Sequence, residues 1–359
     1  MSGEQLHIVG ARPNFMKAAP VVAAAREQGI PTQLVHTGQH YDQAMSHIFF
    51  EQLGMPEPDL NLGVGSGSHA KQTADLMVAI EKTLLSCNPS CVVVYGDINS
   101  TLAAALVASK LHIPVAHVEA GLRSFDRTMP EEVNRIVTDS LSDLLFVTSP
   151  EGLVNLGTEG AAAFKVHFVG NPMIDTLKRF VSVLEPGQIR SELGLSSEYG
   201  VVTVHRPSNV DDPAAAERIV EILRQVSDRI RLVVPLHPRG RGTLTDAGIM
   251  DLPGVLVIDP LGYLEFMALV SQASVVMTDS GGIQEETTVL GIPCITLRDN
   301  TERPITVSHG TNVLVGNNPQ VAIPAAWAAI QKKVDPQEPP LWDGHAGERI
   351  ASVLLQISI

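Results

Sequence analysis

Aromatic and basic residues are scarce in this sequence. Only 4% of its 359 residues are aromatic, and 25 lysines and arginines stand against 39 aspartates and glutamates, a formal net charge of −14. Proteins that bind nucleic acids usually combine a basic surface with aromatic side chains that stack on bases. We therefore expect no nucleic-acid partner, and an anionic ligand would need a local cationic site that works against the overall charge.

Cysteines and long apolar runs are also few. The three cysteines are too few for a disulfide framework, and no histidine pattern accompanies the Cys87–Cys91 spacing, so we expect free thiols in a reducing cytoplasm and no metal. No run approaches 18 apolar residues and the first ten residues do not resemble a signal peptide, so neither a membrane span nor export is expected. The 44% hydrophobic content is enough for a large core.

Short apolar runs alternate with longer helical patterns along the whole chain. Because the apolar runs lack polar alternation, they indicate strands covered on both faces, as in a doubly wound parallel sheet. In the first half the predicted strands are 6–11, 32–38, 91–97, 114–121 and 143–149, with helices at 16–28, 69–86, 101–110 and 131–140. In the second half they are 199–206, 231–238, 255–260, 274–280 and 293–299, with helices at 213–228 and 346–355.

The length and the restart of this pattern predict two domains of the α/β class. We place the boundary in the segment 168–187, which gives an N-terminal domain 1–172 and a C-terminal domain 173–359 whose last helix could pack back on the first domain. Two doubly wound, Rossmann-like domains would face a cleft, and ligands bind at the carboxyl ends of the strands of such sheets. A hinge near Gly170–Asp175 would let the domains close on a ligand.

Carboxylates follow two neighbouring predicted strands and begin the next helix. Asp97 ends one buried strand, Glu119 ends the next, and Glu131 lies four residues before Arg135 on a helix. Taken singly, these residues read as a helix cap and a surface ion pair. Three acidic positions at adjacent strand ends instead favour a site for acid–base chemistry.

Cations and histidines end other strands. Arg12 and Lys17 follow the first strand, where a helix start could bind an anion, although solvated helix ends are an equally good interpretation. His205 and His237 end two strands of the second half and could contact a phosphate or relay a proton. A G-x-G-x-x-G fingerprint is absent, which disfavours a nicotinamide or flavin cofactor.

The segment 278–286, TDSGGIQEE, carries the strongest local signal. Ser280, Gly281 and Gly282 link a strand to a helix, which is typical of a backbone that approaches a pyrophosphate. We expect Glu285 and Glu286 in the first helical turn, where a carboxylate could accept hydrogen bonds from ribose hydroxyls or simply complement the helix dipole.

Two further segments lie near this signal. Arg298 and Arg303 follow the next strand, and Tyr263 and Phe266 are candidates for stacking on a base, with a core role for Phe266 equally probable on its own.

Taken together, the motifs resemble those of the non-hydrolysing UDP-N-acetylglucosamine 2-epimerases. The ordered set runs through nearly the whole chain and comprises GARPNFMK, VYGDINST, HVEAGLRS, MPEEVNR, TVHRPSN, LHPRG, TDSGGIQEE, RDNTERP and HGTNVLVG. The resemblance implies the glycosyltransferase-B fold, a homodimer in the cytoplasm, a role in cell-surface polysaccharide biosynthesis, and no cofactor or metal. It also implies interconversion of UDP-N-acetylglucosamine and UDP-N-acetylmannosamine through elimination of UDP to 2-acetamidoglucal.

The resemblance assigns roles by motif position. The acid–base set is Asp97, Glu119, Glu131 and His205. The substrate-binding set is Arg12, Lys17, Arg135, His237, Phe266, Ser280, Gly281, Gly282, Glu286 and Arg303.

Two departures from the family pattern are visible. Many members carry a glutamate where this chain has Ser208, so a role for that glutamate is lost here. Many bacterial members carry Q-H-R-E-M-L where residues 39–44 read QHYDQA, a region linked to activation by substrate, so we predict weak or absent activation.

Four alternatives remain open at the level of sequence. The nearest is a sister epimerase acting on a modified sugar such as UDP-2,3-diacetamido-2,3-dideoxyglucuronic acid, because residues 36–59 resemble those enzymes too. The others are a hydrolysing 2-epimerase, a glycosyltransferase of the same fold, and a non-catalytic nucleotide-sugar-binding protein. The carboxylate set disfavours the last two, since neither transfer nor binding needs a base for C2.

Overall fold

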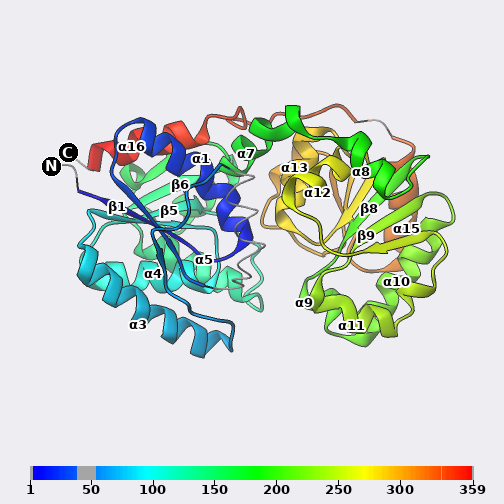
Figure 1. Cartoon of the computed structure of the whole chain (residues 1–359), viewed down its shortest axis with the longest axis horizontal. Helices are drawn as coiled ribbons and strands as arrows, with labels where there is room; N and C mark the ends of the chain where they lie inside the picture. Colours follow the sequence, from blue (N-terminus) through cyan, green and yellow to red (C-terminus); the bar gives the residue numbers. More distant parts are fainter. Residues whose placement is uncertain (1–2, 39–53, 333, 358–359) are drawn as a thin grey trace. The chain divides into compact units, whose positions relative to one another are not determined.

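The computed structural model describes residues 3–38, 54–332 and 334–357. The chain divides into two compact units (Figure 1). Unit 1 comprises Met1–Arg179 together with Pro340–Ile359, and unit 2 comprises Phe180–Pro339. None of the helices in the described ranges is long and apolar enough to cross a membrane.

Unit 1 is built on a parallel sheet in the order β3-β2-β1-β4-β5-β6-β7. Valine-rich strands such as β4 are buried along their whole length, because helices cover both faces of the sheet (Figure 1). On one face α1 packs side by side with α16, and on the other α3 packs on α4. The strands are β1 (Gln5–Val9), β2 (Thr32–His36), β3 (Leu60–Asn61), β4 (Cys91–Tyr95), β5 (Val115–Ala120), β6 (Leu144–Val147) and β7 (Val166–Phe168).

The helices of unit 1 follow the strands along the chain. They are α1 (Arg12–Glu27), α3 (His69–Cys87), α4 (Asn99–Lys110), α5 (Pro130–Leu141), α6 (Pro150–Thr158), α7 (Pro172–Phe180) and α16 (Ala346–Ile357). Leu76, Ile80 and Leu84 recur every four residues on α3 and bury one face of that helix against the strand residues Val92 and Val94.

Unit 2 repeats the architecture with a parallel sheet in the order β10-β9-β8-β11-β12-β13. Its strands are β8 (Tyr199–Thr203), β9 (Arg231–Pro235), β10 (Val255–Ile258), β11 (Val275–Thr278), β12 (Cys294–Thr296) and β13 (Asn312–Leu314). Its helices are α8 (Pro186–Glu192), α9 (Pro207–Val210), α10 (Pro213–Ser227), α11 (Pro238–Asp246), α12 (Tyr263–Ser271), α13 (Gly281–Leu290), α14 (Ile305–Ser308) and α15 (Pro319–Ile330). The α10 and α15 helices pack together on one face, and α8 packs on α12 (Figure 1).

The predicted doubly wound α/β architecture is confirmed in both units. The short edge strands β3, β7 and β13 were not predicted, because two or three residues carry no readable pattern. Predicted strands also ran too far at their carboxyl ends. The sheet stops at Tyr95 and Thr203, so Asp97 and His205 stand in the turns that follow β4 and β8.

The connection between the units differs from the expected boundary at 172/173. The division falls at 179/180 and again at 339/340, since the last segment returns to unit 1. The expected hinge Gly170–Asp175 lies inside unit 1. There Gly170 adopts φ +87° against Leu341, and the buried Asp175 accepts a 2.7 Å hydrogen bond from the Gly347 amide. The hinge at Gly170–Asp175 stays a prediction.

Candidate active site

An irregularity in β5 presents Glu119. The pairing of β5 with β6 shifts register between Val118 and Ala120, and Glu119 has φ +80°, a conformation that non-glycine residues rarely adopt. Backbone strain of this kind is typical of functional positions. The side chain of Glu119 forms a buried ion pair with Lys17 of α1. Lys17, predicted as part of an anion site, thus has a carboxylate partner in the structure, and its binding of a ligand stays a prediction.

Asp97 stands two residues after β4, next to a required glycine. Gly96 has φ +64°, and a Cβ there would lie 3.0 Å from the Lys17 ammonium and 3.2 Å from Glu119 Oε2. Only glycine therefore fits both the backbone and the ion pair. The Asp97 carboxylate accepts a 2.9 Å hydrogen bond from Arg135 Nε, and Arg135 Nη2 forms an ion pair with the same oxygen at 2.7 Å.

The α5 helix carries Glu131, Glu132 and Arg135, the other charged residues of the candidate site in unit 1. The ion pairs of Arg135 are with Asp97 and, at 2.6 Å, with Glu132. Buried Glu132 also accepts 2.9 Å bonds from the amides of Ser124 and Phe125, which holds the loop after β5. Spacing along the helix predicts a pair of Arg135 with Glu131, whereas the structure shows an ion pair with Glu132, the neighbour of Glu131 in the same acidic cluster. Glu131 itself is half-buried in the first turn of α5.

Asn14 connects the first strand to β4. Its side-chain oxygen accepts bonds from the amides of Gly10 and Ala11 at 3.2 Å, and its nitrogen donates to the Tyr95 carbonyl at 2.8 Å. These bonds fix the start of α1 beside the turn that carries Asp97. Arg12 is the first residue of α1, and its side chain falls outside the described parts of the structure, as do residues 39–44.

In unit 2 a buried aspartate positions His205. The Asp279 carboxylate follows β11 and accepts bonds from the His205 and Arg206 amides and from Asn209. It also meets His205 Nδ1 at 3.0 Å. Burial alone would raise the pKa of Asp279, but these bonds and the His205 ring hold it below its usual value. The rings of His205 and His237 lie 5.7 Å apart, so the structure brings the two predicted histidines together.

Gly281 leaves the space that the buried Arg303 side chain occupies. It is the first residue of α13, and a Cβ there would lie 2.3 Å from Arg303 Nη1 and 2.6 Å from Glu302 Oε1. Arg303 in turn contacts Glu302 at 2.5 Å and Glu285 at 2.9 Å, and Glu302 also holds Arg298 at 2.7 Å. The glycine was predicted to admit a pyrophosphate, and the structure adds a second reason for it. Glu302 was not predicted, although both of its arginine partners lie in its own segment, 298–303.

Glu286 lies in the second turn of α13, not in the first as expected. It is buried, and burial raises its pKa to about 8 with help from the neighbouring Glu285 charge, while a hydrogen bond from Tyr263 opposes the shift. Tyr263 and Phe266 both belong to α12, where Tyr263 is buried and Phe266 is half-buried. Ser280 is the cap residue of α13 and its amide bonds to Thr278 Oγ1 at 2.9 Å.

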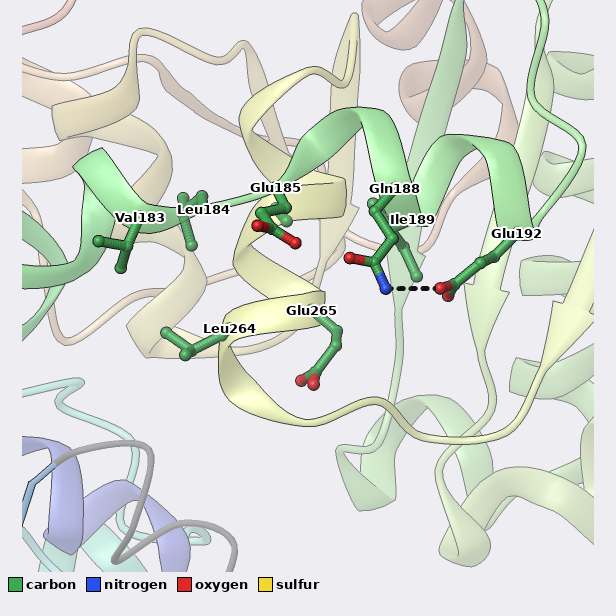
Figure 2. Close-up of a pocket in the computed structure, with 9 residues that line it drawn as sticks. Val183, Leu184, Glu185, Gln188, Ile189, Glu192, Leu264 and Glu265 are labelled. Carbon is green, nitrogen blue, oxygen red and sulfur yellow. Dashed lines mark hydrogen bonds between the residues drawn. The ribbon is translucent and has the colours of Figure 1, made fainter.

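A separate pocket of about 190 Å³ lies on unit 2, between α8 and α12. Figure 2 shows Glu185, Glu192 and Glu265 around it, with Gln188 donating a 2.8 Å bond to Glu192. None of the residues predicted from the sequence lines this pocket. The candidate site is therefore the set of strand-end and helix-start residues described above.

Two parallel α/β units, one with ion-paired carboxylates at its strand ends and one with a glycine-led helix beside an arginine cluster, define a protein of the glycosyltransferase-B type of fold. The family described as UDP-N-acetylglucosamine 2-epimerase matches residues 23–355. The chain belongs to this family.

Relatives of two specificities resemble the chain equally well. It is 42% identical to the UDP-N-acetylglucosamine 2-epimerase of Methanocaldococcus jannaschii, over 97% of each chain. It is 44% identical to the UDP-2,3-diacetamido-2,3-dideoxy-D-glucuronate 2-epimerase of Pseudomonas aeruginosa, over 98% of this chain and 99% of the relative. The M. jannaschii enzyme solved with UDP-GlcNAc and UDP superposes with a TM-score of 0.92 at 41% identity, covering 98% of this chain and 99% of that one.

Proposed function

We propose that the chain epimerises C2 of UDP-N-acetylglucosamine and gives UDP-N-acetylmannosamine. The observation that carries the proposal is the pair of carboxylates at adjacent strand ends, Glu119 against Lys17 and Asp97 against Arg135. Inverting a C–H centre needs one group that removes the proton and one that returns it on the opposite face. Membership of the epimerase family supports the same reaction.

The proposed epimerisation has two steps, elimination of UDP and its re-addition. A carboxylate removes the C2 proton while the C1–oxygen bond breaks and its electron pair leaves with UDP, which forms 2-acetamidoglucal. In the return step the glucal is protonated at C2 on the other face while a UDP oxygen re-forms the bond to C1. A C2–H bond beside an acetal carbon is a weak acid, so proton removal has to be coupled to departure of a good leaving group.

The residues divide between the units in this proposal. Unit 1 supplies the acid–base carboxylates Asp97, Glu119 and Glu131, and Lys17 and Arg135 hold two of them in place. Unit 2 supplies the nucleotide-binding residues, together with His205, whose ring Asp279 orients. The full proposed binding set is Arg12, Lys17, Arg135, His237, Phe266, Ser280, Gly281, Gly282, Glu286 and Arg303. We further propose that the enzyme acts in the cytoplasm as a homodimer in cell-surface polysaccharide biosynthesis.

A second substrate is favoured by a specific observation. The relative that acts on UDP-2,3-diacetamido-2,3-dideoxy-D-glucuronate is as similar to this chain as the relative that acts on UDP-N-acetylglucosamine. Both sugars carry a 2-acetamido group beside the same C1–UDP bond, so one elimination chemistry serves both. The uronate is therefore the second compound to test.

Proton NMR of each UDP-sugar with the pure protein in deuterated water tests the proposal. We expect the 2-epimer to appear with deuterium at C2 and with little free sugar. Free N-acetylmannosamine with UDP would instead identify a hydrolysing enzyme, and absence of exchange with both compounds would refute the proposal. Glu119→Gln should abolish exchange, whereas Glu81→Gln, on the exposed side of α3, should leave it unchanged.

A further inference from the structure

A buried polar network lies behind Asp97 and Glu119 in unit 1. His117 on β5 meets Asp139 of α5 with 2.6 Å between Nδ1 and Oδ1, and both side chains are at most 2% exposed. The second oxygen of Asp139 lies 2.7 Å from Arg123, which also forms a two-point ion pair with Glu159 at 2.6 and 2.8 Å.

The network holds the backbone at two places. Asp139 Oδ2 accepts a 3.0 Å bond from the Gly121 amide, two residues after Glu119. His117 Nε2 lies 2.8 Å from the Gly96 carbonyl, immediately before Asp97. Asp139 therefore fixes the backbone on both sides of Glu119. It bonds directly to the Gly121 amide, and it holds the side chain of His117, two residues before Glu119. Through its bond to the Gly96 carbonyl, His117 also fixes the turn that carries Asp97.

Hydrogen-bond accounting fixes the roles in this chain of contacts. A carbonyl only accepts, so His117 Nε2 must carry a hydrogen and donate it to Gly96. The two oxygens of Asp139 face a ring nitrogen, an amide and a guanidinium, and a carboxylate satisfies all three as acceptor. Burial would raise the pKa of Asp139, but the charges and bonds of His117 and Arg123 hold it below its usual value.

The backbone conformation of Glu119 explains why these hydrogen bonds are needed. Glu119 has φ +80°, which non-glycine residues rarely adopt, whereas Gly96 and Gly121, with φ +64° and +82°, adopt such angles freely. A non-glycine residue in this conformation persists only where surrounding contacts over-determine it. Asp139 and His117 provide contacts to both turns from the interior of unit 1.

We propose that Asp139, acting through His117, is a positioning residue that sets the two turns carrying Asp97 and Glu119. The proposal rests on the proposed function, because it assigns Asp97 and Glu119 to the reaction. It predicts that kcat depends on the hydrogen bonds that residue 139 makes and depends less on the negative charge of Asp139. Asparagine at 139 would still accept from the Gly121 amide and donate to Nδ1 of a neutral His117 whose Nε2–H stays on Gly96.

Three variants of the full chain test the proposal by steady-state kinetics on UDP-N-acetylglucosamine. We expect Asp139→Ala to lower kcat by roughly 100-fold with KM changed less than threefold, the size of loss that small misplacements of reacting groups cause. Asp139→Asn should stay within about fivefold of wild type because it keeps the bonds. Asp143→Ala is the matched control, since Asp143 accepts a 3.1 Å bond from the Val115 amide at the opposite end of β5, and should stay within about twofold.

The kinetic outcomes separate positioning from other roles. Retention of kcat in Asp139→Ala, a loss confined to KM, or an equally large loss in Asp139→Asn would each overturn the proposal. A role in stability alone would leave kcat per folded molecule unchanged in all variants. If Asp139→Ala does not fold, the Asp139→Asn result still decides, because a 100-fold loss there contradicts the bond-keeping argument.

Hydrogen–deuterium exchange provides a readout that needs no substrate. In Asp139→Ala we expect faster exchange at residues 96–98, which Asp139 reaches only through His117, and at 119–121, with no change in β1 and β2. Unchanged exchange at 96–98, or a uniform increase over unit 1, would overturn the proposal. If the wild-type protein turned over neither UDP-sugar, the proposed function would be refuted. The hydrogen–deuterium exchange experiment would still show whether Asp139 holds the two turns.

Discussion

Replacing Glu286 with glutamine should make unit 2 more stable, and increasingly so as the pH rises. Glu286 is buried with a pKa raised from 4.5 to about 8, so the folded chain holds its proton more tightly than the unfolded chain does. Above pH 4.5 the unfolded chain gains free energy by ionising Glu286, whereas the folded chain keeps the proton up to about pH 8, so the folded state is destabilised relative to the unfolded state. The penalty grows until the pH passes the folded pKa and is constant beyond it.

The magnitude follows from the two pKa values. One pKa unit corresponds to about 1.4 kcal/mol, so the penalty is about 2 kcal/mol at pH 6 and approaches about 5 kcal/mol at pH 9. Glutamine has nearly the shape of a protonated glutamate and cannot ionise. The free energy of unfolding of Glu286→Gln should exceed that of the parent by these amounts.

The two tryptophans allow each unit to be followed separately. Trp327 lies in unit 2, with the Arg229 guanidinium 3.9 Å from the centre of its ring, and Trp342 lies in unit 1. In a Trp342→Phe background, urea unfolding followed by fluorescence reports Trp327 alone. The assay compares the free energy of unfolding at pH 6, 7.5 and 9 for the background and for its Glu286→Gln derivative.

Glu285→Gln is the matched control. Glu285 lies next to Glu286 in sequence, but its carboxylate is paired with a cation, whereas that of Glu286 is disfavoured in its charged form by burial. The Glu285 carboxylate pairs with Arg303 at 2.9 Å, so its loss leaves a buried guanidinium with one carboxylate fewer and should destabilise unit 2. A stability gain for Glu286→Gln that does not change between pH 6 and pH 9, or a loss at pH 9, would refute the reasoning.

Two further predictions rest on contacts in the structure and a third on the sequence. Gly281→Ala should destabilise unit 2 by about 2 kcal/mol or more in the same assay, because its Cβ would meet Arg303 at 2.3 Å, whereas Gly187→Ala, which has open space, should not. Lys17→Met should lower kcat by roughly 100-fold, since it leaves Glu119 buried without its ammonium, and an unchanged kcat would exclude this role. Initial rates should depend hyperbolically on substrate, since the motif after the second strand departs from the family's, and a sigmoidal curve would contradict this.

Most of the fold could be predicted from the sequence because buried parallel strands and their helices leave local patterns. The uninterrupted apolar run at 91–95 needs helices on both faces, and the structure provides them. Carboxyl-end positions of Asp97, Glu119 and His205 followed from the same patterns. Edge strands of two or three residues could not be found, because their pairing depends on neighbours distant in sequence.

The contacts within the candidate site could not be predicted. Ion pairs such as Lys17–Glu119 join residues about a hundred positions apart, and no local pattern encodes them. The β5 irregularity that turns Glu119 is likewise a property of the sheet and not of its residues alone. Glycines were visible, but Gly281 faces an arginine that is distant in sequence, a constraint that only the structure reveals.

The return of the chain to unit 1 sets an order of assembly during synthesis. Buried Trp342 donates a 2.9 Å bond to the Thr148 carbonyl, and Gln5 donates to the Leu354 carbonyl at 3.1 Å, across 349 positions of sequence. A ribosome that has made residues 1–339 has synthesised every residue of unit 2 but not yet the last helix of unit 1. Unit 1, begun first, is completed last, and α1 must wait with an uncovered face until translation delivers α16.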